Sequence, residues 1–240
     1  MNFLVALTVT VVACFALRGS IKKAPVVFYA LSIAMVVIYF ASFAATPPRW
    51  LQIALALTMG HCFLPIAMFA VVMYIGIFPY DGKVRHWLQP VRGPLSIMAC
   101  FLALGHMIQY LMVYAPRVIG GAEVSGNVLV SFFVAVLLFA LILVLGVTSF
   151  EFVKKRMTAV TWKKIQRFAY LFYAATYFHL AIMLAPAALS GSSQAQASLG
   201  IYTVVFGVYL VARIILSIQR RGTGLSTAAS EKNGGEIPAA

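Results

Sequence analysis

The chain has 240 residues, of which 63% are hydrophobic and 10% are charged, and its mean hydropathy is +0.98. This composition excludes a soluble globular domain and is typical of an integral membrane protein. The formal charge of +13 would suit nucleic-acid binding, but the cations are placed at the ends of apolar stretches. We therefore expect membrane lipid as the surroundings and no nucleic-acid partner.

Seven apolar stretches come close to the length that crosses a hydrocarbon core about 30 Å thick as a helix. The first is the shortest, and no stretch shows the alternation of a membrane strand. The sequence predicts an all-α integral membrane protein with about seven transmembrane helices. In chain order the stretches cover residues 2–17, 25–44, 51–78, 95–115, 127–149, 166–187 and 199–219.

The cations are divided unevenly between the connecting segments. Sixteen of the eighteen Lys and Arg follow the first, third and fifth stretches or surround the end of the seventh. Only Arg49 and Arg117 lie in the other segments. Because cytoplasmic loops are enriched in Lys and Arg, the N-terminus is predicted outside and the C-terminus inside. We expect a multi-pass protein of the bacterial cytoplasmic (inner) membrane.

Local signals refine this outline. Pro65 lies inside the third stretch and removes a backbone donor, which predicts a kink. Residues 220–240 are polar and rich in Gly, Ala and Ser, which favours a disordered cytoplasmic tail. The three cysteines, Cys14, Cys62 and Cys100, lie within predicted helices without a CxxC motif, which favours simple packing roles.

Three histidines share one predicted depth in the membrane. His106 is 13 residues beyond Gly93, and His179 is 13 beyond Gln166, on two helices that run in the same direction. At a rise of about 1.5 Å per residue, both lie roughly 20 Å from the inner face. His61, on the third stretch, reaches a similar depth from the outer side. An ionisable side chain at such depth marks a functional site by default.

Two imidazoles on facing helices can ligate one haem iron. We therefore interpret His106 and His179 as the axial ligands of a haem b, with the haem iron as the metal. The same residues leave open a buried metal ion, a proton relay or simple hydrogen bonds between helices. His61 is assigned a place near the haem or at a quinol site, and no residue is assigned a catalytic role.

The segment from Thr148 to His179 carries a further pattern, a Thr-Ser pair, a basic turn, a Trp and a final His. It reads TSFEFVKKRMTAVTWKKIQRFAYLFYAATYFH. This resembles the ferric reductase-like transmembrane domain family, and in pattern it is most similar to the family's haem-binding membrane subunits of MsrQ (YedZ) type. Gly93 to Tyr110 is similar to the family's other motif. The resemblance covers roughly residues 60–202, so the two helices of residues 1–50 lie outside it and residues 51–219 form the haem-binding bundle.

The resemblance implies a b-type haem protein that passes electrons from quinol or a flavoprotein reductase to an extracytoplasmic redox acceptor protein. His106 and His179 match its ligand positions, and Gln166 stands where the family has a further His, so one haem is expected. FMN or quinone as another cofactor is left open. We expect the electron-transfer subunit of an oxidoreductase system. The alternatives are a stand-alone ferric, metal or quinone reductase and a haem-free membrane scaffold or transporter.

Overall fold

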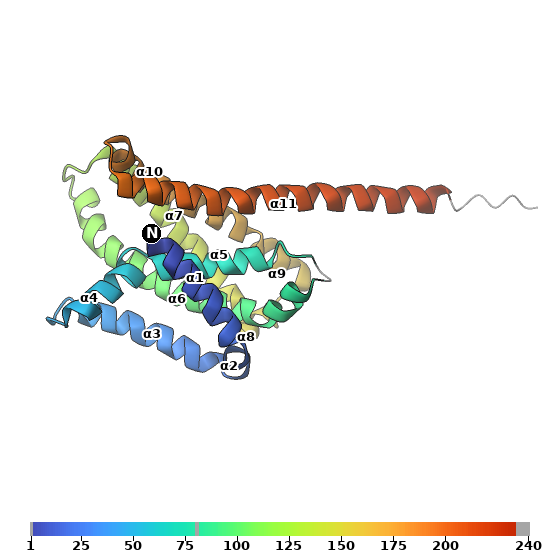
Figure 1. Ribbon diagram of the computed structural model, residues 1–240, viewed down its shortest axis with the longest axis horizontal. Helices are drawn as coiled ribbons and strands as arrows, with labels where there is room; N and C mark the ends of the chain where they lie inside the picture. Colours follow the sequence, from blue (N-terminus) through green and yellow to red (C-terminus); the bar gives the residue numbers. More distant parts are fainter. Residues whose placement is uncertain (1, 80–81, 234–240) are drawn as a thin grey trace, which may run out of the picture.

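The computed structural model describes residues 2–79 and 82–233, and within these every regular element is a helix. The helices pack into one bundle, from which the second half of the last helix projects (Figure 1). In chain order they are α1 (Asn2–Ala16), α2 (Arg18–Lys23), α3 (Pro25–Ala41), α4 (Arg49–Leu55), the π-helix η1 (Ala56–Gly60), α5 (Phe63–Ile75), α6 (Lys83–Ile119), α7 (Gly126–Ser149), α8 (Glu151–Lys154), α9 (Ala159–Gln166), α10 (Phe168–Leu189) and α11 (Ser193–Asn233).

Within the described ranges, four helical segments are long and apolar enough to cross a membrane: α6, α7, the α9–α10 segment and α11 up to Gln219. The bent segment formed by α4, η1 and α5 makes a fifth. With 15 and 17 residues, α1 and α3 are apolar but shorter than the roughly 20 residues that a full span needs. The prediction of an all-helical membrane protein is confirmed, whereas the count of seven spans and the orientation of the termini stay predictions.

The bend before α5 lies at His61 and Cys62. The two parts of this segment meet at 43°. Pro65 lies four residues after His61 and has no N–H, so the His61 carbonyl finds no helical donor there. Cys62 adopts a left-handed conformation with φ 58°, which is uncommon for a residue with a Cβ atom. The kink expected from Pro65 is therefore present, and it puts His61 at a break between helices.

The short helix α5 lies at the centre of the bundle. Nine of its thirteen residues are buried. One face packs with α1, α3 and α6, and another packs against α10 and α11 through Tyr173 and Tyr202. A further apolar cluster joins α6, α7 and α10. A helix that is apolar on all sides is stable only where neighbours cover it, and α5 meets that condition.

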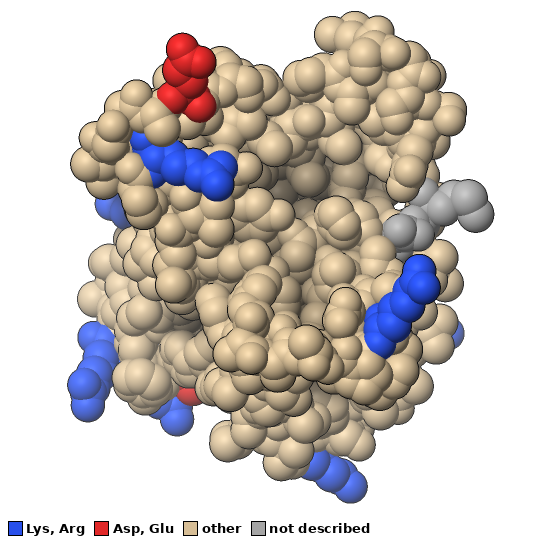
Figure 2. All heavy atoms as spheres, turned by 90° about the vertical axis from the view of Figure 1, so that its left-hand side faces the viewer, with Lys and Arg blue, Asp and Glu red and all other residues tan. Residues whose placement is uncertain are grey.

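The two ends of the bundle differ in charge. Figure 2 looks at the end where α6 and α10 finish, and there the surface carries few charged side chains and is hollowed at its centre. This end corresponds to the predicted outer side. The opposite end holds α2, α8 and α9, where Lys and Arg are concentrated. We call these the outer end and the inner end.

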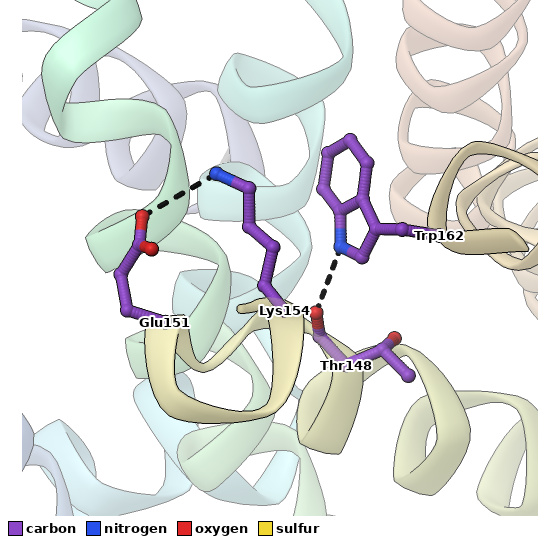
Figure 3. A network of polar contacts seen from close by, with 4 residues as sticks. All are labelled: Thr148, Glu151, Lys154 and Trp162. Atoms are coloured by element: carbon purple, nitrogen blue, oxygen red, sulfur yellow. Dashed lines mark hydrogen bonds and ion pairs between the residues drawn. The ribbon is translucent and has the colours of Figure 1, made fainter. Parts of the chain in front are cut away.

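At the inner end, α8 and α9 form an elbow (residues 150–167) that joins α7 to α10. The indole N–H of Trp162 donates to the Thr148 carbonyl (2.9 Å), and the Gln166 amide donates to the Thr148 hydroxyl (3.0 Å). Lys154 pairs with Glu151 at 3.3 Å and lies 5.2 Å from the centre of the Trp162 ring. Figure 3 shows the Trp162 indole directed at the Thr148 carbonyl near the end of α7, with Lys154 and Glu151 beside it, and the last carbonyls of a helix need such donors.

The last helix is longer than the sequence suggests. The structure continues α11 as a helix from residue 220 to 233, and residues 234–240 lie outside the described part, so the disorder predicted for residues 220–240 stays a prediction. Gly222 and Gly224 each disfavour a helix by about 1 kcal/mol relative to Ala. However, residues 193–237 contain no proline that would stop the helix, and adding a residue to a formed helix costs far less than starting one.

Candidate functional site

All three intramembrane histidines line one cavity near the outer end. Its volume is about 440 Å³, which falls in the range of roughly 300–1,000 Å³ typical of ligand pockets. Helices α6, α7, α10 and the first turns of α11 surround it, and the break before α5 closes one side. The lining is mostly apolar. Its hydroxyl and amide groups come from Tyr110, Tyr114, Ser131, Thr176, Ser192, Gln194, Ser198 and Tyr202.

The ring of His106 is held by the π-helix. Its Nδ1 atom lies 2.9 Å from the carbonyl oxygen of Met59, a residue of η1. Because a carbonyl can only accept, Nδ1 carries the proton and Nε2 keeps its lone pair. The ring of Tyr110 lies 4.6 Å from that of His106, and its hydroxyl approaches the Gly60 carbonyl at 3.4 Å. A π-helix at a functional site is a recurrent feature of proteins, and here it presents two carbonyls to α6.

The ring of His179 is held by α7. Its Nδ1 atom lies 2.9 Å from the Ser131 hydroxyl and 3.3 Å from the Ser131 carbonyl. A proton on Nδ1 satisfies both contacts, which again leaves the lone pair on Nε2. Ser131 is itself buried, with 2% of its surface exposed. The two histidines are thus anchored in the same way, each through Nδ1 to an uncharged acceptor.

This anchoring matters for what the cavity can hold. An imidazole that binds a metal through one nitrogen almost always donates its other N–H to a carbonyl or a carboxylate. His106 has this arrangement, and His179 has the equivalent with a hydroxyl and a carbonyl. In the part of the chain that the structure describes, no group of three or more His, Cys, Asp or Glu could hold a metal ion. The cavity therefore offers a pair of neutral imidazoles and lacks the set of three or four ligands that a bare zinc ion requires.

His61 differs from the other two histidines. It is exposed at the helix break, and its ring stacks on that of Phe63 at 5.3 Å. Its side chain makes no hydrogen bond within the described residues. Besides the main cavity, it borders a second hollow of about 550 Å³, next to Tyr39 and Gln109, whose side chains are hydrogen-bonded to each other. The structure brings His61 to the same cavity but leaves its ring unanchored.

Ser131 and the carbonyl of Met59 are functional groups that the sequence analysis missed. The sequence does contain a signal for Ser131. It is a hydroxyl residue in the outer half of α7, and His179 is predicted to lie in the same outer half of the membrane. Nothing in the sequence marks Met59, because its carbonyl becomes available only where the helix changes to π geometry. Of the cysteines, Cys14 and Cys100 are buried, and Cys62 lines the cavity.

Comparisons with known proteins give one sequence relative. No protein-family model matches the chain, and no solved structure matches it. The chain is 34% identical over 226 residues to an uncharacterized protein of Treponema pallidum (strain Nichols). The match covers 92% of this chain and 62% of that protein, so the chain spans less than two thirds of its relative's length.

Proposed function

We propose that the chain is a b-type haem protein of ferric reductase-like, MsrQ-like kind that transfers electrons in the bacterial cytoplasmic membrane. The observation that carries the proposal is the pair formed by His106 and His179. They line one apolar cavity, and each is anchored through Nδ1 to an uncharged acceptor. The anchoring leaves the lone pair on Nε2 of both rings, through which His106 and His179 would hold the iron of a single haem.

The residues present fit a haem. His106 and His179 would hold the haem through its iron, since neutral imidazoles are good ligands for haem iron. Phe69, Leu138 and Phe172 give the cavity apolar walls that keep water away from the bound group. Ser192 and Gln194 lie at the start of α11 and suit the carboxylates on the edge of the ring. A haem bound here would supply one-electron chemistry.

The proposed electron route follows from the position of the cavity. It lies at the outer end, so electrons delivered there are available to an extracytoplasmic redox acceptor protein. Quinol in the membrane or a flavoprotein reductase is the proposed donor. The chain then acts as the electron-transfer subunit of an oxidoreductase system. Gln166 makes a hydrogen bond to Thr148 at the inner end, which supports the expectation of one haem without a second ligand there.

The proposal includes seven spans, with the N-terminus outside and the C-terminus inside. The concentration of Lys and Arg at the inner end supports this orientation, and the similarity to a bacterial protein supports the bacterial membrane. In this reading α1 and α3 cross the membrane although they are short, because a short apolar helix can thin the bilayer locally.

The orientation can be tested with two exposed positions. Thr158 lies on the inner elbow, and Ala122 lies in the outer segment between α6 and α7. With Thr158→Cys, a membrane-impermeant maleimide should label intact cells no more than wild type does, and label strongly after lysis. Ala122→Cys is the matched control and should be labelled in intact cells. Labelling of the Thr158→Cys protein from outside would reverse the topology.

The absorption spectrum of the purified protein tests the function itself. We expect a Soret band, sharp bands in the reduced-minus-oxidised spectrum and about one haem per chain by pyridine haemochrome assay. A protein that folds in cells supplied with haem but shows no Soret band would overturn the proposal and favour a membrane scaffold or transporter. Turnover of ferric iron or quinone by the purified chain without a partner would favour a stand-alone reductase.

A further inference from the structure

A second hollow lies beside the histidine cavity, the space that is lined by His61, His106 and His179. Its volume is about 550 Å³, which falls in the range of roughly 300–1,000 Å³ typical of ligand pockets. It lies between the end of α3, the α4–η1 segment and α6. Gly60, His61 and Tyr110 line both spaces and therefore form the wall between them. A molecule in this hollow lies next to whatever the histidine cavity holds.

One polar group of this hollow is held in place by a hydrogen bond and keeps unused donors. The Tyr39 hydroxyl donates to the amide oxygen of Gln109, which leaves the amide N–H groups of Gln109 as donors. These N–H groups make no hydrogen bond within residues 2–79 and 82–233. The Tyr39 hydroxyl also lies close to Gly60, since a Cβ atom there would be 3.7 Å from its oxygen. The Tyr39–Gln109 pair is therefore next to the helix break that carries His61.

His61 supplies the hollow with a second polar group. Its ring is exposed, stacks on Phe63 and makes no hydrogen bond within the described part of the chain. A neutral imidazole carries one donor nitrogen and one acceptor nitrogen. The hollow thus offers free N–H donors on Gln109, and both a donor and an acceptor on His61. These groups suit a ligand with oxygen atoms at two places on one ring.

The rest of the lining indicates that this ligand is uncharged and aromatic. Among the described residues, no Lys, Arg, Asp or Glu lines the hollow, and an ion would find no opposite charge there to compensate for its lost water. Three aromatic residues, Tyr39, Phe43 and Tyr110, line it together with Leu55. Aromatic rings pack favourably against each other. Phe43 is 58% exposed and lies at the rim, where a lipid-soluble molecule can enter.

We propose that this hollow binds the ring of a membrane quinol, with Gln109 and His61 as the residues that hydrogen-bond its two oxygen atoms. A quinol ring is flat and uncharged, carries oxygen atoms on opposite sides and has a lipid-soluble tail. The site rests on the proposed function for its role, because it places the electron donor beside the histidine cavity. Oxidation of the quinol to a quinone releases two protons to the outer aqueous phase. The two electrons pass singly to the oxidant, which is the ferric haem of the proposed function.

Isothermal titration calorimetry of the purified full chain in a neutral detergent tests this site. The probe is duroquinone, a fully methylated benzoquinone with no free ring carbon to which a cysteine could add. Wild type should bind one duroquinone per chain. The comparison compound is durene, the methylated benzene ring without the two oxygen atoms, and wild type should bind it far more weakly. Equal affinity for the two compounds would overturn the proposal, because it would show that the hollow does not recognise the oxygen atoms.

Variants on the lining assign the binding to this hollow. Gln109→Leu removes the amide donors and should weaken duroquinone binding up to about tenfold, and His61→Ala, at an exposed position, about threefold. Gln196→Leu and His86→Ala are the matched controls, because both residues are exposed and line neither space. Unchanged binding in Gln109→Leu would overturn the proposal. If His61→Ala alone weakens binding, the ring lies in the histidine cavity, since Gln109 lines only the second hollow.

Two further measurements separate this site from folding and from the haem. If Gln109→Leu lowers the apparent melting temperature without quinone, the double variant Tyr39→Phe with Gln109→Leu takes its place. Removing both partners leaves neither of them buried and unpaired. The titration is repeated on chain produced in cells starved of haem, which should bind duroquinone equally well. Duroquinone binding by a chain that takes up no haem would refute the electron-transfer function and leave this site standing. A haem-bearing chain that binds no duroquinone would refute this site alone.

Discussion

At both ends of this bundle, hydrogen bonds to protein acceptors hold polar side chains in place, but the two ends differ in the chemical groups that remain available. At the outer end, His106 is anchored to the Met59 carbonyl, and His179 to a hydroxyl and a carbonyl of Ser131. At the inner end, Arg18 donates to the Trp87 carbonyl at 2.6 Å, much as Arg92 donates to the end of α5. The acceptors in these contacts are all uncharged.

The difference lies in the side chains themselves. An imidazole can give up its proton and stay neutral in an apolar site, whereas a guanidinium keeps its charge. The outer anchors therefore leave a lone pair on each imidazole, while the inner guanidinium groups keep their positive charge and further N–H donors. The outer end thus offers electron-pair donors and the inner end positive charge, and the predictions below test what the outer end holds.

The largest effect should come from removing an anchored imidazole. His106→Ala or His179→Ala deletes one proposed axial ligand and leaves a void in an apolar site, so either variant should lose most of its bound haem. Haem per folded chain, from the pyridine haemochrome assay, is the measurement. His86→Ala, at an exposed position near the inner end, is the matched control and should keep its haem. A normal low-spin spectrum in either variant at the outer end would remove that residue from the ligand pair.

The next effect concerns the packing that positions the Met59 carbonyl. A Cβ atom at Gly105 would lie 2.6 Å from the Met59 side chain and 3.1 Å from Val36. Gly105→Ala should therefore destabilise the protein by about 1–3 kcal/mol and perturb the haem spectrum, because Met59 must move. Gly93→Ala is the control on the same helix, where nothing lies within 4 Å of the new atom. It should be neutral or stabilising in thermal unfolding followed by circular dichroism.

A smaller effect is expected at the Ser131 anchor. Ser131→Ala removes the hydroxyl that holds His179 but leaves the ligand, so haem should still bind, about 10–100-fold more weakly, with a shifted midpoint potential. Ser32→Ala is the control, because Ser32 is also buried but donates only to Phe28 within its own helix. Potentiometric titration and haem retention during dilution give the two values. An unchanged potential and affinity would show that the Ser131 contact does not tune the ligand.

Much of this arrangement could be predicted from the sequence, and the remainder depends on packing. Apolar stretches place the helices, Pro65 places the kink, and counting residues from the helix ends places His106 and His179 on one cavity. These signals are local or depend only on the helical rise. The central position of α5 is not visible in the same way. In a membrane, lipid-facing and protein-facing side chains are equally apolar, so hydropathy does not identify the buried helix.

The anchors of the site illustrate the same limit. The Met59 carbonyl is a backbone group, and its role depends on the π-helix and on the close approach of Gly105. The elbow at the inner end was predicted as a cationic loop, yet Trp162 and Gln166 fold it against Thr148. The first feature depends on a contact between residues 47 positions apart, and the second on contacts across 14 and 18 positions. Neither set of contacts follows from hydropathy or from the local sequence pattern.

The smallest effect on haem content is predicted for His61. Although it lines the same cavity, it lies at a helix break, is exposed and stacks on Phe63, and no hydrogen bond within the described residues orients its ring. A ligand has to be held in place before the metal arrives, and the Nδ1 anchors of the other two histidines meet that need where His61 does not. His61→Ala should therefore keep its haem and its low-spin spectrum, with at most a modest change in potential or in the rate of reduction by a quinol analogue. His61→Gln, which restores a polar side chain of similar reach, should reverse any change that depends on hydrogen bonding. If His61→Ala loses its haem while His106→Ala or His179→Ala retains it, His61 takes the ligand position, and an imidazole without an anchor proves sufficient to hold the iron.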